Sequence, residues 1–401
     1  MMFSESTDYH KSILEVKERG FNCIRLEDFA GMLWDADGNE RRDLKIHAPF
    51  GHYTKYTTYK TLMISGTINP LERLLAFCRA AQELEMKIIP SSWFFLHTNW
   101  FLEEEDSQPL FDLSTEEKIS FFADELDRIL CLLKKEGLID IVAFAEIFNE
   151  FDGLPFAGEY KPVPEEEALI LRGLHEAAID KLKKKHPDIL FAYDSWKPNM
   201  QESMIPRNID VLNFHYYYAR SIYRHFENGY ISWSMEDRPI PPETEYYLIK
   251  DHPTVKDTIE AMGGIPKTGR DWPSILCLYT SIDPDKQDEL CDMLEGHFEE
   301  EFEAYKNHIH HGLKLAADIR DRVAPGAKLV MGEGATYCPS PDLPFECNSK
   351  IAWKLFEEHI RYAVQLNFWG TVIRTNARQG DATWTTNKED YLRLNGLFLY
   401  S

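Results

Sequence analysis

A (β/α)8 TIM barrel with long loops is the fold class that the sequence predicts, on three observations. Apolar strand-like runs alternate with amphipathic helical segments along the chain, which is the pattern of βαβ units in a parallel sheet. Seven such runs occur, near residues 22, 88, 142, 190, 211, 329 and 371, and eight parallel strands would close a barrel. No G-x-G-x-x-G or G-x-x-x-x-G-K-[ST] turn follows any of them, which disfavours an open doubly wound sheet.

The N-terminal part opens with a predicted helix from Ser6 to Arg19, capped by Ser6 or Thr7, and Gly20 ends it. The run FNCIRL at 21–26 is then a buried strand. A helix that leads into a strand should follow an earlier strand, but only MMFS stands before it. We therefore expect the first barrel strand to be short or missing.

Two capping signals place the next helices. Asn69-Pro70 opens a helix to Glu85, and Ser114-Thr115-Glu116-Glu117 opens another that runs to Glu136. The segment 86–93 between them reads as a strand. The flanking segments 27–69 and 94–113 are rich in aromatic and polar residues, and we predict long loops there.

The stretch IVAFAEIFNEFDG at 141–153 is the most informative one. The run from Ile141 to Phe148 is apolar apart from Glu146, as expected of a parallel strand that is covered on both faces. Such a strand would present the pair Asn149-Glu150 at its C-terminal end, where loops of this fold carry chemistry.

The alternation continues to the C-terminus. Helices are predicted at 164–185, 299–323, 349–366 and 388–397, and strands at 189–194, 209–217, 328–333 and 370–375. The region of about 219–298 reads as an insertion after strand six, with Pro, Gly and acidic residues and only short elements. We predict one catalytic barrel domain over 1–401 that carries this insertion.

Composition excludes several function classes. A net charge of -23 and a pI near 5.0 leave no basic face for nucleic acid or an anionic membrane. The 7 cysteines are odd in number and widely spaced, which indicates reduced thiols. No basic segment followed by a long apolar run opens the chain, so the expected location is the cytoplasm.

In a barrel, functional residues lie at the C-terminal ends of the strands. The polar or aromatic residues predicted there are Arg25, Ser92, Trp93, Asn149, Glu150, Asp194, His215, Tyr217, Glu333, Arg374 and Thr375. Glu150 and Glu333 close the fourth and seventh strands, so they would face each other across the barrel mouth. Taken alone, each glutamate could equally be a loop carboxylate.

Two facing carboxyl groups suit glycoside hydrolysis, in which one is a protonated acid and the other an ionised nucleophile. A separation of about 5 Å gives retention of configuration. We expect Arg25 and a tyrosine hydroxyl to keep Glu333 ionised, and apolar surroundings to raise the pKa of Glu150.

The motifs G-F-N-C-I-R-L, F-N-E, H-Y-Y and M-G-E-G, in this order, resemble the retaining (β/α)8 glycoside hydrolases of the cellulase and mannanase clan. The resemblance is greatest to glycoside hydrolase family 5, and it covers the chain from about Lys11 to Leu397. It implies that Glu150 is the acid/base and Glu333 the nucleophile. It further implies that Asn149 holds the sugar 2-hydroxyl, that Arg25 and Tyr217 position the nucleophile, and that His215 contacts the acid/base or the sugar.

Trp93 and Trp384 are candidate platforms for a sugar ring, although tryptophans of α/β proteins are more often core residues. No H-x-H motif stands on an early strand, so neither a metal nor a cofactor is expected. The predicted substrates are oligosaccharides or small β-glycosides. A non-catalytic carbohydrate-binding protein on the same fold is the alternative. The sequence leaves the sugar, the linkage and the oligomeric state open.

Overall fold

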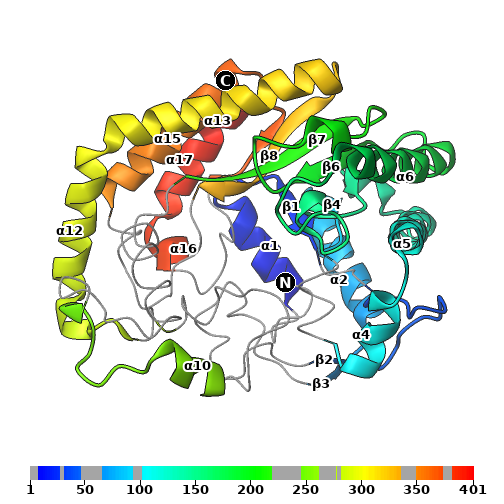
Figure 1. Ribbon diagram of the computed structural model, residues 1–401, viewed down its shortest axis with the longest axis horizontal. Helices are drawn as coiled ribbons and strands as arrows, with labels where there is room; N and C mark the ends of the chain where they lie inside the picture. Colours follow the sequence, from blue (N-terminus) through cyan, green and yellow to red (C-terminus); the bar gives the residue numbers. More distant parts are fainter. Residues whose placement is uncertain are drawn as a thin grey trace.

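The computed structural model describes most of the chain as parallel strands flanked by helices (Figure 1). The described residues are 8–27, 31–46, 66–93, 102–218, 245–261, 277, 281–335, 349–373 and 382–401. The predicted α/β class is therefore confirmed. The predicted strand end at Arg374 and Thr375 and the predicted caps Ser6 and Thr7 lie outside the described residues.

The strands that the sequence predicted form two parallel sheets that are joined by a bridge. A 5-stranded sheet has the order β5 (Ala145–Glu146), β6 (Phe191–Ser195), β7 (Val211–Tyr217), β8 (Lys328–Ala335) and β9 (Gly370–Thr371). A 2-stranded sheet pairs β1 (Cys23–Leu26) with β4 (Lys87–Pro90), also in parallel. A parallel bridge between Ile88 and Val142 joins the two sheets just before β5. Each of the strand positions predicted from the sequence holds one of these strands.

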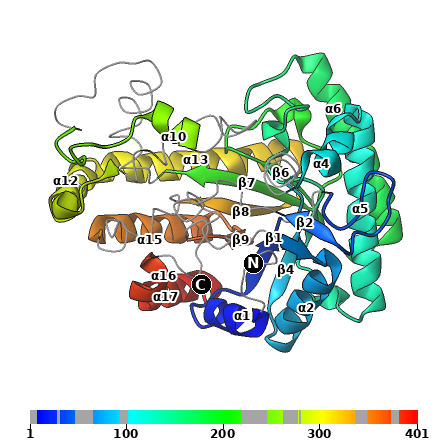
Figure 2. The ribbon, with the colours of Figure 1, turned by 90° about the horizontal axis from the view of Figure 1, so that it is seen from below.

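A layer of helices lies outside the strands (Figure 2). Its members are α1 (Tyr9–Lys17), α2 (Pro70–Glu83), α5 (Thr115–Lys135), α6 (Glu165–Lys185), α13 (Phe302–Val323), α15 (Lys350–Gln365) and α17 (Lys388–Leu399). The last helix of the layer contacts the end of the first, because Asn395 Nδ2 of α17 donates to the Arg19 carbonyl after α1 at 2.8 Å. Among the described strands no pairing joins β9 to β1, so strand pairing does not by itself complete the predicted eight-stranded barrel.

Two of the predicted helix starts are confirmed by their caps. Asn69 Oδ1 accepts from the Glu72 N–H at the start of α2, and Ser114 with Glu117 forms a complete capping box at the start of α5. The first helix is shorter than predicted: Asp8 caps it through the Lys11 N–H, and α1 begins at Tyr9. An Asp is as good an N-cap as Ser, so composition alone did not choose between neighbouring candidates.

The strand predicted over 141–148 is the main correction. Only Ala145–Glu146 form β5, and a 3-10 turn, η2 (Ile139–Ile141), stands where the strand was expected to begin. A buried apolar run can be irregular backbone as readily as strand, because burial rather than periodicity produces its composition. The C-terminal half of the run still lies against β6, whose Leu190 carbonyl accepts from the Ala145 N–H at 2.9 Å.

Helices and an antiparallel pair of strands occur where loops were predicted. The segment 27–69 contains an antiparallel pair, β2 (Leu44–Ile46) and β3 (Gly66–Ile68), and 94–113 contains α4 (Glu104–Phe111) despite Pro109. The insertion holds α10 (Val255–Ala261) and the 14-residue α12 (Gln287–Glu300), which is longer than the short elements predicted. Acidic residues in the first turns of α4 and α12 favour these helices through the helix dipole. Within the described residues, no helix combines the length and apolar character needed to cross a bilayer.

Candidate active site

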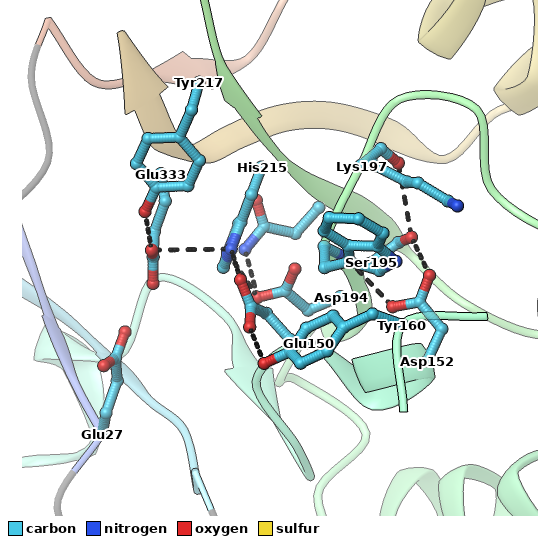
Figure 3. A network of polar contacts seen from close by, with 12 residues as sticks. Glu27, Glu150, Asp152, Tyr160, Asp194, Ser195, Lys197, His215, Tyr217 and Glu333 are labelled. Atoms are coloured by element: carbon cyan, nitrogen blue, oxygen red, sulfur yellow. Dashed lines mark hydrogen bonds and ion pairs between the residues drawn. The ribbon is translucent and has the colours of Figure 1, made fainter. Parts of the chain in front are cut away.

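Three predicted residues, one after β5, one on β7 and one on β8, meet at the C-terminal ends of the strands (Figure 3). His215 Nδ1 lies 2.7 Å from Glu150 Oε1 and 3.5 Å from Glu333 Oε2. A carboxylate oxygen of Glu150 and one of Glu333 lie within 4.8 Å of each other. The fold thus brings together two glutamates that are separated by more than 180 residues in the sequence.

The backbone around Glu150 is built to present this side chain. Phe148 and Phe151 are buried at 1% and 0% exposure, and their rings contact each other and His175 of α6. Glu150 itself has φ 46 and ψ 55, the left-handed region that side chains other than glycine adopt only at a cost. The Asn149 N–H donates to the Ser92 carbonyl at 2.8 Å. Aromatic packing on both sides therefore holds Glu150 in a strained conformation that directs it to the strand ends.

Glu333 reaches the same place through an irregularity in β8. Phe214 pairs with Met331, but the next residue, His215, pairs with Glu333, so Gly332 is an extra residue in β8. A Cβ on Gly332 would lie 2.5 Å from Asn213 Nδ2, which explains why glycine stands there. The bulge turns Glu333 toward His215, and the glycine in the M-G-E-G motif makes the bulge possible.

Two further predicted residues contact Glu333. Arg25 Nη2 donates to Glu333 Oε1 and also pairs with Glu27 Oε1 at 2.5 Å. The Tyr217 hydroxyl donates to Glu333 Oε2. Arg25, at the end of β1, thereby connects the first described strand to the far side of the site.

The partners of Glu150 complete a pattern in which every carboxylate oxygen of the pair is engaged. Glu150 Oε1 is paired with His215, and Glu150 Oε2 accepts from the Tyr160 hydroxyl at 3.0 Å. Glu150, His215 and Glu333 also form one of two described groups whose ligand atoms could hold a metal ion; the other is Asp127, Cys131 and His186. At the first group a cation would have to displace Arg25 and the tyrosine hydroxyls, so its donors fit hydrogen bonding better than metal ligation.

Burial and charge set the protonation of this cluster. Burial raises the pKa of Glu333 to about 7, although the charges of His215 and Arg25 act in the opposite direction. Burial works to lower the pKa of His215, but Asp194 and Glu333 overcome it and hold that pKa well above its usual value. The expectation that Arg25 and a tyrosine hydroxyl would keep Glu333 ionised was wrong about the direction of the pKa shift, because it left the desolvation of the carboxylate out of account.

A second polar layer lies beneath the glutamates. Asp194 Oδ2 on β6 receives Arg25 Nη1 at 3.0 Å, His215 Nε2 at 3.1 Å and Asn213 Nδ2 at 3.2 Å. Asn213 Nδ2 also donates to Glu146 Oε1 at 2.7 Å. Burial, followed by the charge of Asp194, raises the pKa of Glu146 to about 8. This layer holds Arg25 and His215 in place from below the two glutamates.

Asn149 presents an unused amide at the site. Its side chain is fully buried, and within the described part of the chain no hydrogen-bond partner reaches Oδ1 or Nδ2. A buried amide normally finds partners for both atoms. One donor and one acceptor left open beside Glu150 suit a hydroxyl group of a ligand.

The two tryptophans predicted as sugar platforms differ in their surroundings. Trp93 is half-buried at the strand ends, where its backbone N–H donates to the Glu27 carbonyl at 3.4 Å. Trp384 is only 2% exposed, stacks on Phe21 and lies under the Arg19 guanidinium. Its assignment as a sugar platform was wrong, because its ring is packed in the core between α1 and α17 and has no face to offer.

Sequence reasoning missed several members of the cluster. Glu27 follows Arg25 by two residues and Asn213 precedes His215 by two, so the two-residue period of strands could have assigned them to the same face. Tyr160 and Asp152 lie in the turn after Glu150, where no periodicity applies. Only the folded structure brings these two residues to the site.

Comparison with known proteins shows similarity in fold. A protein from Parabacteroides distasonis, provisionally named a glycoside hydrolase, matches with a TM-score of 0.63 and 18% identity over 98% of this chain and 87% of that chain. A broad-specificity endoglucanase from Bacteroides salanitronis gives a TM-score of 0.49 and 8% identity over 99% and 86% of the two chains. An endo-1,4-β-D-mannanase from Thermotoga petrophila gives 0.47 and 11% over 92% and 84%. These last two values are too low to add weight.

No family model and no curated protein matches the sequence. The resemblance to glycoside hydrolases that the motifs indicate is confirmed at the level of fold by the first of these structures.

Proposed function

We propose that the protein is a retaining β-glycoside hydrolase that acts by double displacement on oligosaccharides or small β-glycosides. Glu150 is the acid/base and Glu333 the nucleophile. The observation that carries the proposal is the distance of at most 4.8 Å between a carboxylate oxygen of Glu150 and one of Glu333, at the same end of the parallel strands. Retaining enzymes hold their carboxyl groups about 5 Å apart, whereas inverting enzymes need about 6.5 to 9.5 Å to admit a water.

Each reaction step uses a contact already described. Glu333 attacks the anomeric carbon while Glu150 gives its proton to the departing oxygen, so an ester bond forms as the glycosidic bond breaks. A water then gives its proton to Glu150 and attacks the same carbon, which frees Glu333. Arg25 and Tyr217 hold the two oxygens of Glu333 in place for the attack.

The charges of the cluster support a shared proton. Arg25 and His215 bring two positive charges against the carboxylates of Glu27 and Asp194. Glu150 and Glu333 lie beside these ion pairs. Two negative charges at this distance repel each other, so the two carboxyl groups favour a state in which they hold one proton between them. One protonated and one ionised carboxyl is the state that double displacement requires.

The substrate class follows from the same residues. The open amide of Asn149 suits a sugar hydroxyl next to the bond that breaks, and Trp93 is a half-buried aromatic at the same strand ends. We also take the fold to be a closed (β/α)8 barrel, a proposal supported by the contact of α17 with the end of α1.

Covalent trapping tests the proposal. A panel of 2-deoxy-2-fluoro β-glycosides with a 2,4-dinitrophenyl leaving group should inactivate the protein and raise its mass by one glycosyl unit. Fluorine slows both steps by destabilising the positive charge of their transition states, while the activated leaving group restores the first. Peptide mapping should place the sugar on Glu333. Binding of sugars without any adduct or turnover would favour the non-catalytic alternative, and an adduct elsewhere would remove Glu333 as nucleophile.

The rate should depend on the ionisation of Glu333. Its pKa of about 7 lies above the ordinary 4.5, and only the ionised form attacks. We therefore expect kcat/KM to fall about tenfold per unit as the pH drops below about 7, with the apparent pKa belonging to the glutamate pair. A profile measured on one activated glycoside checks this, and a rate that stays constant down to pH 5 would contradict it.

A further inference from the structure

The acid/base carboxyl has a partner that the two-glutamate scheme does not use. The Tyr160 hydroxyl donates to Glu150 Oε2 at 3.0 Å, opposite the oxygen that His215 engages (Figure 3). Tyr160 lies ten residues beyond Glu150, past the turn η3 (Phe151–Gly153) and its following loop. The chain therefore turns back on itself after Glu150, and the Tyr160 hydroxyl reaches the Glu150 carboxyl group.

The backbone of this loop is strained in a way that fixes Tyr160. Both Glu159 and Tyr160 have positive φ values, 49 and 66, which non-glycine residues adopt at a cost of about 1 to 3 kcal/mol each. The Tyr160 N–H donates to the Asp152 carbonyl at 3.1 Å. Strain of this kind persists only where surrounding contacts determine the conformation.

The ring of Tyr160 fits a prepared space. A Cβ on Gly153 would lie 2.3 Å from Tyr160 Cε1, so the ring lies directly over a glycine that any other residue would push away. On another side the indole of Trp196 meets it edge to face, with 5.0 Å between ring centroids. These two contacts orient the ring so that its hydroxyl faces Glu150.

Asp152 links the turn after Glu150 to the segment that carries Trp196. Its Oδ2 accepts from the Ser195 hydroxyl at 2.7 Å and its Oδ1 from the backbone N–H of Trp196 at 3.0 Å. The side chain is buried at 6% exposure. The loop after Glu150 is thus fastened to the end of β6, and Trp196 is held where it supports Tyr160.

We propose that Tyr160 is a positioning residue of the active site, which fixes the Glu150 carboxyl group and stabilises its ionised form through the hydroxyl bond to Oε2. The proposal rests on the acid/base role of Glu150 given above. With His215 on Oε1 and Tyr160 on Oε2, rotation of the carboxyl group is restricted. When Glu150 gives its proton to the leaving oxygen, the Tyr160 bond strengthens because charge develops on its acceptor.

The variant Tyr160→Phe removes this bond and keeps the ring contacts with Gly153 and Trp196. A carboxyl that loses a donor to its ionised form becomes a weaker acid, so its pKa rises. We expect kcat/KM to fall about tenfold for alkyl glycosides or disaccharides, whose leaving groups need the proton, and to change less than about twofold for 2,4-dinitrophenyl glycosides. The alkaline limb of the pH profile should move up by about one unit.

The change in acidity can also be measured without turnover. The Glu150 carboxyl should titrate about one unit higher in Tyr160→Phe than in the unmodified protein, followed by carbon NMR of labelled glutamate and assigned with Glu150→Gln. The other charged groups near Glu150 are His215 on β7, Glu333 on β8, Arg25 behind Glu333 and Asp152 in the adjoining turn. All of them are unchanged in the comparison, so the difference reports the hydroxyl.

Tyr391→Phe is the matched control. It removes another tyrosine hydroxyl bond, to Thr383 Oγ1 at 3.0 Å next to α17, away from the strand ends. It should leave the leaving-group dependence and the alkaline limb unchanged. Equal losses on both substrate classes in Tyr160→Phe, or an unmoved Glu150 titration, would overturn the proposal while trapping on Glu333 still stood. Absence of trapping and turnover in the unmodified protein would instead overturn the proposed function.

Discussion

Replacing Glu333 with glycine should lower the hydrolysis of 2,4-dinitrophenyl β-glycosides by about 10⁴- to 10⁶-fold, because no other group can form the covalent intermediate. An activated leaving group makes this a strict test, since such a substrate does not need the proton of Glu150. Steady-state rates on purified protein, with folding checked by circular dichroism, provide the measurement.

A small anion should then restore turnover. Glycine leaves a space below the anomeric carbon, and azide that enters it can attack from the side that Glu333 occupied. Only one displacement occurs, so the product should be an α-glycosyl azide, identified by its proton NMR coupling. A β-glycosyl azide from this variant would assign Glu333 to the acid/base position and reverse the proposed roles.

Glu27→Gln is the matched control for this experiment. Glu27 shares Arg25 Nη2 with Glu333, so its loss alters the same network without removing the proposed nucleophile. We expect a reduction of at most about tenfold, with no response to azide. A loss of rate as large as that of Glu333→Gly would instead identify Glu27 as the nucleophile.

The sequence allowed prediction of those parts of the molecule that follow a period. The two-residue alternation of β7 places His215 and Tyr217 on one face with Asn213, and the structure has all three toward the cluster. The caps Asn69 and Ser114 were predictable from their own side-chain chemistry. The meeting of Glu150 with Glu333 was predictable from the order of the strands. In a parallel sheet, the ends of strands are brought together by topology alone.

The rest depended on contacts between distant segments. Desolvation of Glu333 arises only when β1, β7 and β8 enclose it, so its raised pKa cannot be read from its neighbours in sequence. Trp384 was assigned to the sugar by residue type, but its partner Phe21 lies more than 360 residues away. Tyr160 carries no signal at all, because its position comes from two left-handed residues and the missing side chain of Gly153.

The acid/base Glu150 and its partner Tyr160 are both held by a strained backbone. Glu150 has a left-handed backbone, and Tyr160, its hydrogen-bond partner, also has one. Each conformation costs stability, and aromatic contacts of Phe148, Phe151 and Trp196 offset that cost. Three of the six non-glycine residues with positive φ in the described part of the chain, Glu150, Glu159 and Tyr160, lie in the segment that delivers the acid/base. A fixed carboxyl geometry matters most to proton transfer at this point.

Glu150→Ala should affect the formation and the hydrolysis of the covalent intermediate to different extents, depending on the leaving group. For disaccharides and alkyl glycosides, kcat/KM should fall by about 10²- to 10⁴-fold, because no group protonates the leaving oxygen. For 2,4-dinitrophenyl glycosides the first step should persist while the second slows, since no base activates the water. The glycosyl-enzyme should then accumulate, with kcat and KM falling together and a burst of dinitrophenol in pre-steady-state measurements.

Azide should rescue this variant with the opposite stereochemistry to Glu333→Gly. The accumulated intermediate has an α-linked sugar on Glu333, and azide needs no base to attack it from the face that Glu150 occupied. The product should therefore be a β-glycosyl azide. Because His215 and Tyr160 both lose their acceptor in Glu150→Ala, Glu150→Gln serves as control: it keeps an acceptor for one of them but cannot donate an acidic proton. If Glu150→Ala cleaved disaccharides at the unmodified rate, Glu150 would have no part in proton transfer, and the role of Tyr160 would fall with it.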